Sequence, residues 1–112
     1  MRIAMPVTNG KLSMHFGHCR EFALVDVDDA SGEVRAVSLV DAPDHAPGVL
    51  PRWLGEQGVT VVIAGGMGRR AIDLFAQQGI AVTVGAQSDD PEAIARAYVE
   101  KTLTTGDNVC DH

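Results

Sequence analysis

Several features that would place this chain in a familiar class are missing from it. No apolar run in the 112 residues approaches the length that is needed to cross a bilayer. The first residues, Met1–Pro6, lack the basic and apolar regions of a secretory signal peptide. No repeat, low-complexity segment or linker interrupts the sequence. We therefore expect one cytoplasmic domain without a membrane partner, residues 1–101, followed by a polar tail, residues 102–112.

The chain also lacks an excess of basic residues. Its net charge is −6, whereas nucleic-acid binding needs a basic footprint, so nucleic acid is not expected as a partner. The acidic residues are unevenly spread: none precedes Glu21, and none lies between Glu56 and Asp73. The same segments hold basic side chains, namely Arg2, Lys11, Arg20, Arg69 and Arg70. This distribution predicts a locally positive pocket on an acidic protein.

Cysteine is scarce. The chain has two cysteines, Cys19 and Cys110, which lie far apart in the sequence. A structural disulfide is not expected in a cytosolic protein. Two free thiols are unremarkable alone, and only the residues beside them in the sequence make them candidates for metal ligands.

The hydrophobic pattern predicts an α/β domain. Strands are predicted at residues 2–7, 22–27, 34–40, 60–64 and 80–84. The second and third strands form a hairpin around residues 28–32, and residues 8–19 form a loop. Helices are predicted after residue 47, at residues 69–78, and from Pro91 to Lys101 with Asp90 as the cap.

The order β-β-β-α-β-α-β-α predicts how the sheet is assembled. Three antiparallel strands followed by two right-handed crossovers give a mixed five-stranded sheet with three helices on its faces. The ribonuclease H-like strand order, 3-2-1-4-5, satisfies these rules. Its first, third, fourth and fifth strands run parallel, and ligands bind where the order reverses, between the first and fourth strands.

Candidate metal ligands follow these parallel strands. His15, His18 and Cys19 lie within five residues after the first strand, and His45 follows the third. Imidazole and thiolate suit zinc, copper and iron–sulfur species, although the spacing matches no zinc-finger motif. Exposed histidines and a small buried cysteine would explain the same residues. The tail adds Cys110 and His112, and its eleven residues could extend about 35 Å back to the ligand edge.

A glycine-rich turn follows the fourth strand. Gly65, Gly66, Met67 and Gly68 lead directly into a helix that begins with Arg69 and Arg70. Glycines allow a ligand to approach the backbone, and the first N–H groups of a helix favour anions. The turn lacks the lysine of a phosphate-binding loop, and it could equally serve as a tight strand-to-helix connection. Met67 is either a thioether ligand or an apolar filler.

Three segments together resemble a known family. Residues 13–19, 44–48 and 62–71 are similar to the dinitrogenase iron–molybdenum cofactor-binding family, which includes NifX-type proteins and the C-terminal domain of NifB-type proteins. The resemblance implies a ribonuclease H-like fold and binding of the iron–molybdenum cofactor, its precursor or a related metal–sulfur cluster. By motif it assigns cofactor binding to His15, Phe16, Gly17, His18, Gly65, Gly66, Met67 and Gly68. A Cys-x-His near the C-terminus, here Cys110 and His112, is similar to stand-alone members.

These observations predict a small carrier or scaffold for a molybdenum-, iron- or copper-containing sulfur cluster, not an enzyme. Arg69 and Arg70 would balance the charge of the cluster, and donor and acceptor proteins would be its partners. A nuclease needs clustered carboxylates, and the ligand edge offers mainly Asp41 and Asp44. Two alternatives remain, namely a ligand-free interaction or regulatory domain and mononuclear zinc or copper binding through His and Cys.

Overall fold

One mixed β-sheet organises the chain. The structure, a computed structural model, describes residues 1–13, 16, 20–43, 48–103 and 105–106. Within these ranges the strands are β1 (Arg2–Thr8), β2 (Lys11–Leu12), β3 (Glu21–Val27), β4 (Val34–Asp41), β5 (Val61–Ile63) and β6 (Ala81–Thr83). They lie in the order β4-β3-β1-β5-β6, and β2 pairs with β1 outside this path. The sheet is therefore built around β1.

The strand order predicted for the five longer strands is confirmed. β1 pairs parallel with β5 and antiparallel with β3, which pairs antiparallel with β4. β5 pairs parallel with β6. As a result β1, β4, β5 and β6 run in the same direction. A β-bulge between Asp26 and Val27 shifts the β3–β4 register near the hairpin that joins the two strands.

The prediction of only five strands was wrong. β2 lies in the segment that was expected to be a loop, where Val7 pairs with Leu12 and Thr8 pairs with Lys11. The two connecting residues, Asn9 and Gly10, have φ values of 54° and 81°. Positive φ at both positions is the requirement of a two-residue type I′ hairpin turn. The chain therefore folds back on β1 before it continues to the predicted ligand loop.

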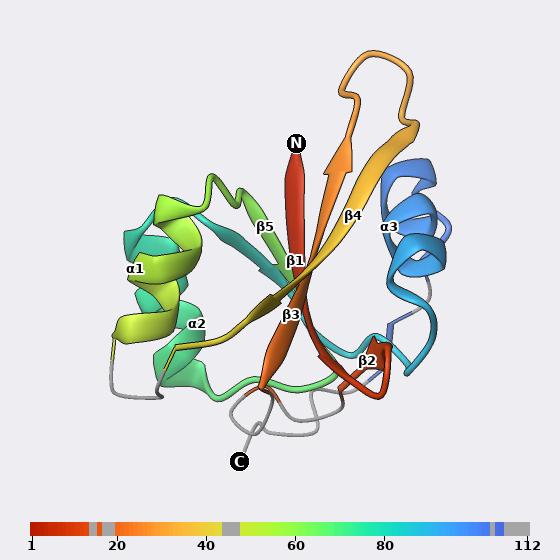
Figure 1. The fold of residues 1–112 in the computed structure, drawn as a ribbon. Coiled ribbons are helices and arrows are strands. Elements are labelled where there is room, and N and C mark those ends of the chain that lie inside the picture. The colour runs from red at the N-terminus through yellow and green to blue at the C-terminus, as the bar shows by residue number, and fades with distance from the viewer. Residues whose placement is uncertain (14–15, 17–19, 44–47, 104, 107–112) are drawn as a thin grey trace.

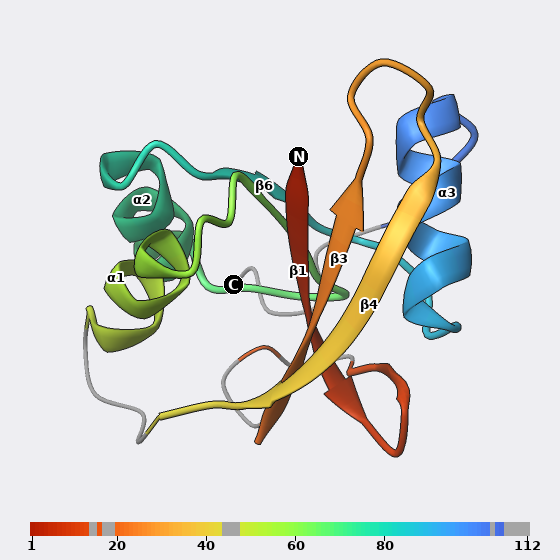
Figure 2. The same ribbon diagram turned by 45° about the horizontal axis from the view of Figure 1, so that its top comes forward.

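Three helices cover the two faces of the sheet. α1 (Val49–Glu56) and α2 (Arg69–Gln77) pack on one face, and α3 (Pro91–Glu100) packs on the other, as Figures 1 and 2 show. α3 begins as predicted: the Asp90 carboxylate accepts hydrogen bonds from the backbone N–H groups of Glu92 and Ala93, at 3.1 and 3.3 Å. This cap satisfies donors that would otherwise lack a partner at the helix start.

A hydrophobic core lies on each side of the sheet. On the α1–α2 side, strand residues pack against helix residues, including Phe22, Leu24, Leu54, Val62 and Phe75. On the α3 side, the core includes Ile3, Met5, Val25, Ile63 and Ile94. β1 and β5 contribute to both cores because alternate side chains point to opposite faces of a strand. This explains why the central strands are apolar without interruption.

The chain continues past α3 along the domain. Leu103 packs against the α3-side core, and Thr105 pairs with Ala86 in an isolated antiparallel bridge. The described part of the predicted tail therefore lies against residues 1–101. No helix within the described ranges is long and apolar enough to cross a membrane.

Candidate functional site

The predicted ligand edge lies where the four parallel strands end. β1, β4, β5 and β6 end at the lower edge of the sheet in Figure 1. β1 and β5 are neighbours. From β1 the chain adds strands toward one end of the sheet, and from β5 it adds β6 toward the other end, so the strand order reverses between β1 and β5. This is the position at which α/β sheets bind ligands. The segments that follow these strands are residues 9–20, 42–48, 64–68 and 84–90.

Hydrogen bonds fix the glycine turn from two sides. Gly65 and Gly66 are buried. The Gly65 carbonyl accepts a hydrogen bond from the backbone N–H of Gly85 at 3.0 Å, and the Gly66 carbonyl accepts one from Phe16 at 3.3 Å. The turn is thus connected both to the segment after β6 and to the loop that carries the predicted His-Phe-Gly motif.

The C-terminal segment extends this network. The Gly85 carbonyl accepts a hydrogen bond from the N–H of Gly106 at 2.7 Å, next to the Ala86–Thr105 bridge. Gly85 therefore bonds the glycine turn on one side and the C-terminal segment on the other. The sequence did not single out Gly85, because its partners are distant in the chain and leave no local pattern.

A further bond joins the two predicted histidine loops. The Arg20 carbonyl, after the first loop, accepts a hydrogen bond from the N–H of Ala42 at 2.8 Å, just after β4. Arg20 itself is exposed. The segments on which His15, His18 and His45 were predicted to act are thereby anchored next to one another at their described ends.

Phe16 and Met67 direct their side chains into the core. They are 6% and 1% exposed and belong to the α1–α2-side core. The Phe16 ring packs edge-on against Phe22 and Phe75, with centroid distances of 5.7 and 5.5 Å. The sequence left Met67 as either a thioether ligand or an apolar residue that fills the core, and its burial agrees with the second interpretation. Phe16 contributes its backbone N–H to the turn, while its ring anchors the loop.

Gly68 opens the helix that follows the turn. It occupies the N-cap position of α2 in an extended conformation and supplies no side-chain cap. A Cβ built at Gly68 would meet no atom within 4 Å, so the space beside it is open. The first turn of α2 contains no acidic residue. Arg69 and Arg70 begin the helix, are exposed, and form no ion pair with any other described residue.

The remaining predicted site residues lie outside the described residues. They are His15, Gly17, His18, Cys19, His45, Cys110 and His112. Asp44, which was weighed as a carboxylate of the edge, also lies outside them. Among the described residues there is no group of three or more His, Cys, Asp or Glu that could hold a metal ion. The described residues contain no histidine or cysteine, so the predicted metal ligands stay a prediction.

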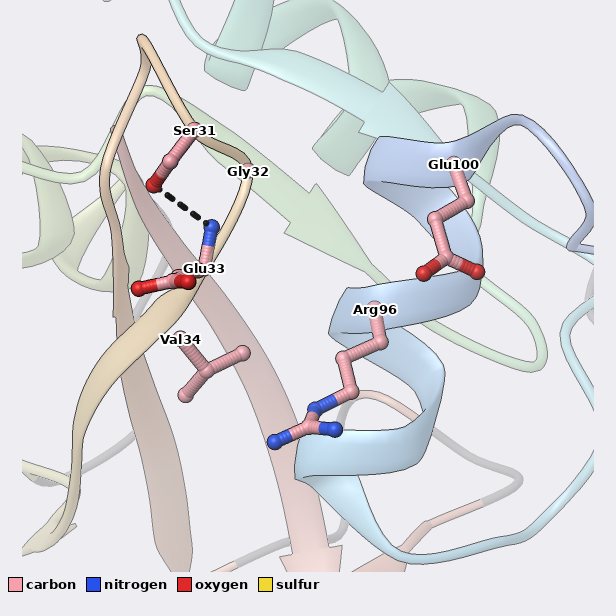
Figure 3. A pocket seen from close by; sticks show the side chains of 6 residues that line it. All are labelled: Ser31, Gly32, Glu33, Val34, Arg96 and Glu100. Atoms are coloured by element: carbon pink, nitrogen blue, oxygen red, sulfur yellow. Dashed lines mark hydrogen bonds between the residues drawn. The ribbon is translucent and has the colours of Figure 1, made fainter.

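A cavity of about 380 Å³ lies at the opposite end of the sheet. It is formed between the β3–β4 hairpin and α3, as Figure 3 shows, and its lining residues are Ser31, Gly32, Glu33, Val34, Arg96 and Glu100. None of the predicted site residues lines it. Its charged groups belong to the hairpin tip and to the last two turns of α3, so this cavity is separate from the ligand edge.

Comparison with known proteins places the chain in a family. Residues 1–101 match the sequence model of the family described as dinitrogenase iron-molybdenum cofactor. An uncharacterised protein of Methanocaldococcus jannaschii is 32% identical over 87 residues, and the match covers 73% of this chain and 72% of that protein.

Solved structures share the fold. The crystal structure of PH0822 superimposes with a TM-score of 0.84 at 31% identity, covering 94% of each chain. The apo form of the orange protein from Desulfovibrio gigas superimposes with a TM-score of 0.70, covering 96% of this chain and 93% of that one. Its sequence is 21% identical, so that second likeness describes the fold alone.

Proposed function

Because this chain belongs to the dinitrogenase iron-molybdenum cofactor family, we propose that it binds and carries an anionic metal–sulfur cluster. The cargo would be the iron–molybdenum cofactor, its precursor or a related molybdenum-, iron- or copper-containing sulfur species. The protein would act as a small carrier or scaffold between a donor and an acceptor protein, without catalysis of its own. The ribonuclease H-like fold class belongs to the same proposal.

The observation that carries the proposal is the fixed glycine turn at the start of α2. The carbonyls of Gly65 and Gly66 are already bonded to neighbouring segments, so the turn is held in place before any ligand arrives. Beside it lies open space at Gly68 and a helix start without acidic residues. The first N–H groups of a helix and its dipole favour an anion there.

The proposed ligands enter from the segments anchored around this turn. His15 directly precedes Phe16 in the sequence, and His18 and Cys19 lie between Phe16 and Arg20. His45 follows β4. Imidazole and thiolate groups bind the metals of such clusters. We include Cys110 and His112, because Cys110 follows Gly106 by four residues. Four extended residues reach about 14 Å at most, so a chain that continues from Gly106 would be long enough to bring Cys110 to the edge.

The first prediction is uptake of the cargo. After anaerobic incubation with sulfide and iron, molybdate or copper, the desalted protein should retain both metal and sulfide and absorb visible light. Zinc without sulfide is the control, since a mononuclear His–Cys site would retain zinc alone.

The Cys19→Ser variant should lose more cargo than Cys110→Ser, because Cys19 belongs to a loop fixed at both ends. Retention of no metal and no sulfide under any of these conditions would contradict the carrier function.

The second prediction concerns Arg69 and Arg70. Replacing both with Gln should preserve the fold, since the side chains are exposed and Gln is a comparable helix former. Affinity for a purified cluster should fall by about tenfold or more, and its dependence on salt should weaken, because fewer charge contacts remain to be screened.

A charge-matched control separates local from global effects. Arg52→Gln with Arg96→Gln removes the same net charge from exposed positions on α1 and α3. This control should bind the cluster with nearly unchanged affinity at both high and low ionic strength. Equal weakening by the two double variants would show that only net charge matters, and it would remove Arg69 and Arg70 from the site.

A further inference from the structure

The chain returns to the ligand edge after α3. Figure 1 shows it turning back at the end of the helix and reaching the lower edge of the sheet. Three described residues of this part, Leu103, Thr105 and Gly106, form what we call the C-terminal strap. Leu103 is half-buried against the α3-side core, whereas Thr105 and Gly106 are exposed. The strap is therefore held by few contacts, and segments of that kind detach more easily than the core of a domain.

Two hydrogen bonds connect the strap to the glycine turn in series. The Gly106 N–H donates to the Gly85 carbonyl at 2.7 Å. The peptide group that contains this carbonyl also carries the N–H of Ala86, which donates to the Ala64 carbonyl at 3.3 Å. The peptide group of that second carbonyl carries the N–H of Gly65, the first glycine of the turn. Three peptide groups thus lie in a row, each bonded to the next in the same direction, and we call this row the relay.

The relay begins at the glycine turn with a donor. Gly65 is buried, and its N–H forms no hydrogen bond with another described residue. A buried N–H group nearly always has a partner in a folded protein. An anion at the turn is the partner that the proposed function supplies.

A negative charge at this turn strengthens each bond of the relay. It polarises the first peptide group, which makes the Ala64 carbonyl a better acceptor for the Ala86 N–H, and hydrogen bonds in series polarise one another. The Gly85 carbonyl then becomes a better acceptor for the Gly106 N–H. In the reverse direction an attached strap makes the Gly65 N–H a better donor, as the reciprocity of two coupled sites requires.

We propose that the strap responds to loading: cargo at the glycine turn holds it on the domain, and a carrier without cargo releases it more often. The coupling rests on the proposed function, because the anionic cargo is the charge that acts on the relay. Detachment of the strap is nevertheless measured separately from the amount of cargo retained. Loaded and empty carriers would present different C-terminal surfaces to the proteins that donate or accept the cargo.

Hydrogen exchange at single amides tests the relay. The protein is measured by NMR when empty and after loading with thiomolybdate, a small molybdenum–sulfur dianion, and molybdenum is counted in the same sample. Exchange of the Gly106 N–H should slow by about fivefold or more on loading. The matched control is the Gly32 N–H, which donates to the Asp28 carbonyl at the same distance of 2.7 Å but lies at the opposite end of the sheet. Its exchange should stay unchanged.

A pair of variants tests the coupling from the other side. Gly106→Pro removes the donating N–H, whereas Gly106→Ala keeps it, and a Cβ at this position would come no closer than 3.9 Å to another described residue. Gly106→Pro should weaken thiomolybdate binding by the same factor by which loading slows the exchange, and Gly106→Ala should bind like the unaltered chain. The difference should persist when Cys110→Ser and His112→Ala are added, since the tail then supplies no ligand.

The outcomes separate the coupling from the carrier function. If no molybdenum is retained, the carrier function fails and the coupling fails with it. If molybdenum is retained but the Gly106 N–H exchanges as fast as in the empty protein, the coupling is overturned while the carrier function stands. Equal affinity of Gly106→Pro and Gly106→Ala for thiomolybdate in both backgrounds also overturns the coupling.

Discussion

Replacing Gly85 with Ala should detach the C-terminal segment from the ligand edge and destabilise the protein strongly. Gly85 has a φ of 85°, which costs an L-residue about 1–2 kcal/mol. Its new Cβ would also collide with the Gly106 carbonyl oxygen and lie 2.8 Å from the carbonyl carbon. Detachment relieves this collision but loses the Gly106–Gly85 hydrogen bond, which is worth about 0.5–1.5 kcal/mol, so we expect the free energy of unfolding to fall by about 2–3 kcal/mol.

The matched control is Gly79→Ala. Gly79 has a φ of 74°, but a Cβ there would meet no atom within 4 Å. Its loss of stability should therefore be limited to the backbone cost of about 1–2 kcal/mol. Denaturant titration measures both losses, and limited proteolysis should show a newly cleaved C-terminal segment only in the Gly85 variant. If the two variants lose equal stability and keep the same proteolysis pattern, the Gly85–Gly106 contact does not hold this segment.

The same pair of variants separates stability from cargo binding. Under the proposed function, Cys110 and His112 are kept near the edge by the Gly106–Gly85 bond. Gly85→Ala should then reduce retained metal and sulfide even at a temperature where the domain is fully folded. Gly79→Ala, with a similar backbone strain far from that bond, should keep its cargo.

Replacing Phe16 with Ala should cost about 3–5 kcal/mol of the free energy of unfolding. The ring is 6% exposed and packs against Phe22 and Phe75, so its removal leaves a cavity and breaks two aromatic contacts. Phe16→Leu keeps most of the volume and should cost clearly less. Chemical denaturation of the metal-free proteins measures both changes.

This result would distinguish an anchoring ring from a ligand-contacting one. A small loss of stability in Phe16→Ala, below about 1 kcal/mol, is what a surface substitution gives. Together with lost cluster binding, it would mean that the ring contacts the cargo instead of the core. The packing with Phe22 and Phe75 leads us to expect the opposite result.

The sequence predicted the sheet well because its signals are local. Alternating Ile3, Met5 and Val7 indicate β1, and the unbroken apolar run from Val59 indicates that β5 is a central strand. Asp90-Pro91 marks the start of α3. β2 was not predicted because its two residues are too few to show an alternating pattern. Its turn was visible as Asn9-Gly10, and the type I′ geometry of that dipeptide was the signal that could have revealed the hairpin.

The candidate site was only partly predictable for a related reason. The glycine turn and the two arginines are contiguous, so their position after β5 follows from the strand prediction. Gly85 acts through bonds to Gly65 and Gly106, each about twenty residues away, and such pairings depend on the assembled fold. The burial of Phe16 depends likewise on Phe75 from a helix that forms much later in the chain.

The central place of β1 has a consequence for synthesis of the chain. β1 is made first, and it can pair with β3 as soon as Glu21–Val27 have left the ribosome. On its other side β2 pairs with Val7 and Thr8 early, but the part that pairs with β5, where Ile3 meets Val61, stays open until more than half of the chain exists. Contacts so distant in sequence form slowly, and open strand edges promote aggregation. During translation the open side of β1 is therefore the surface that a nascent-chain chaperone would protect.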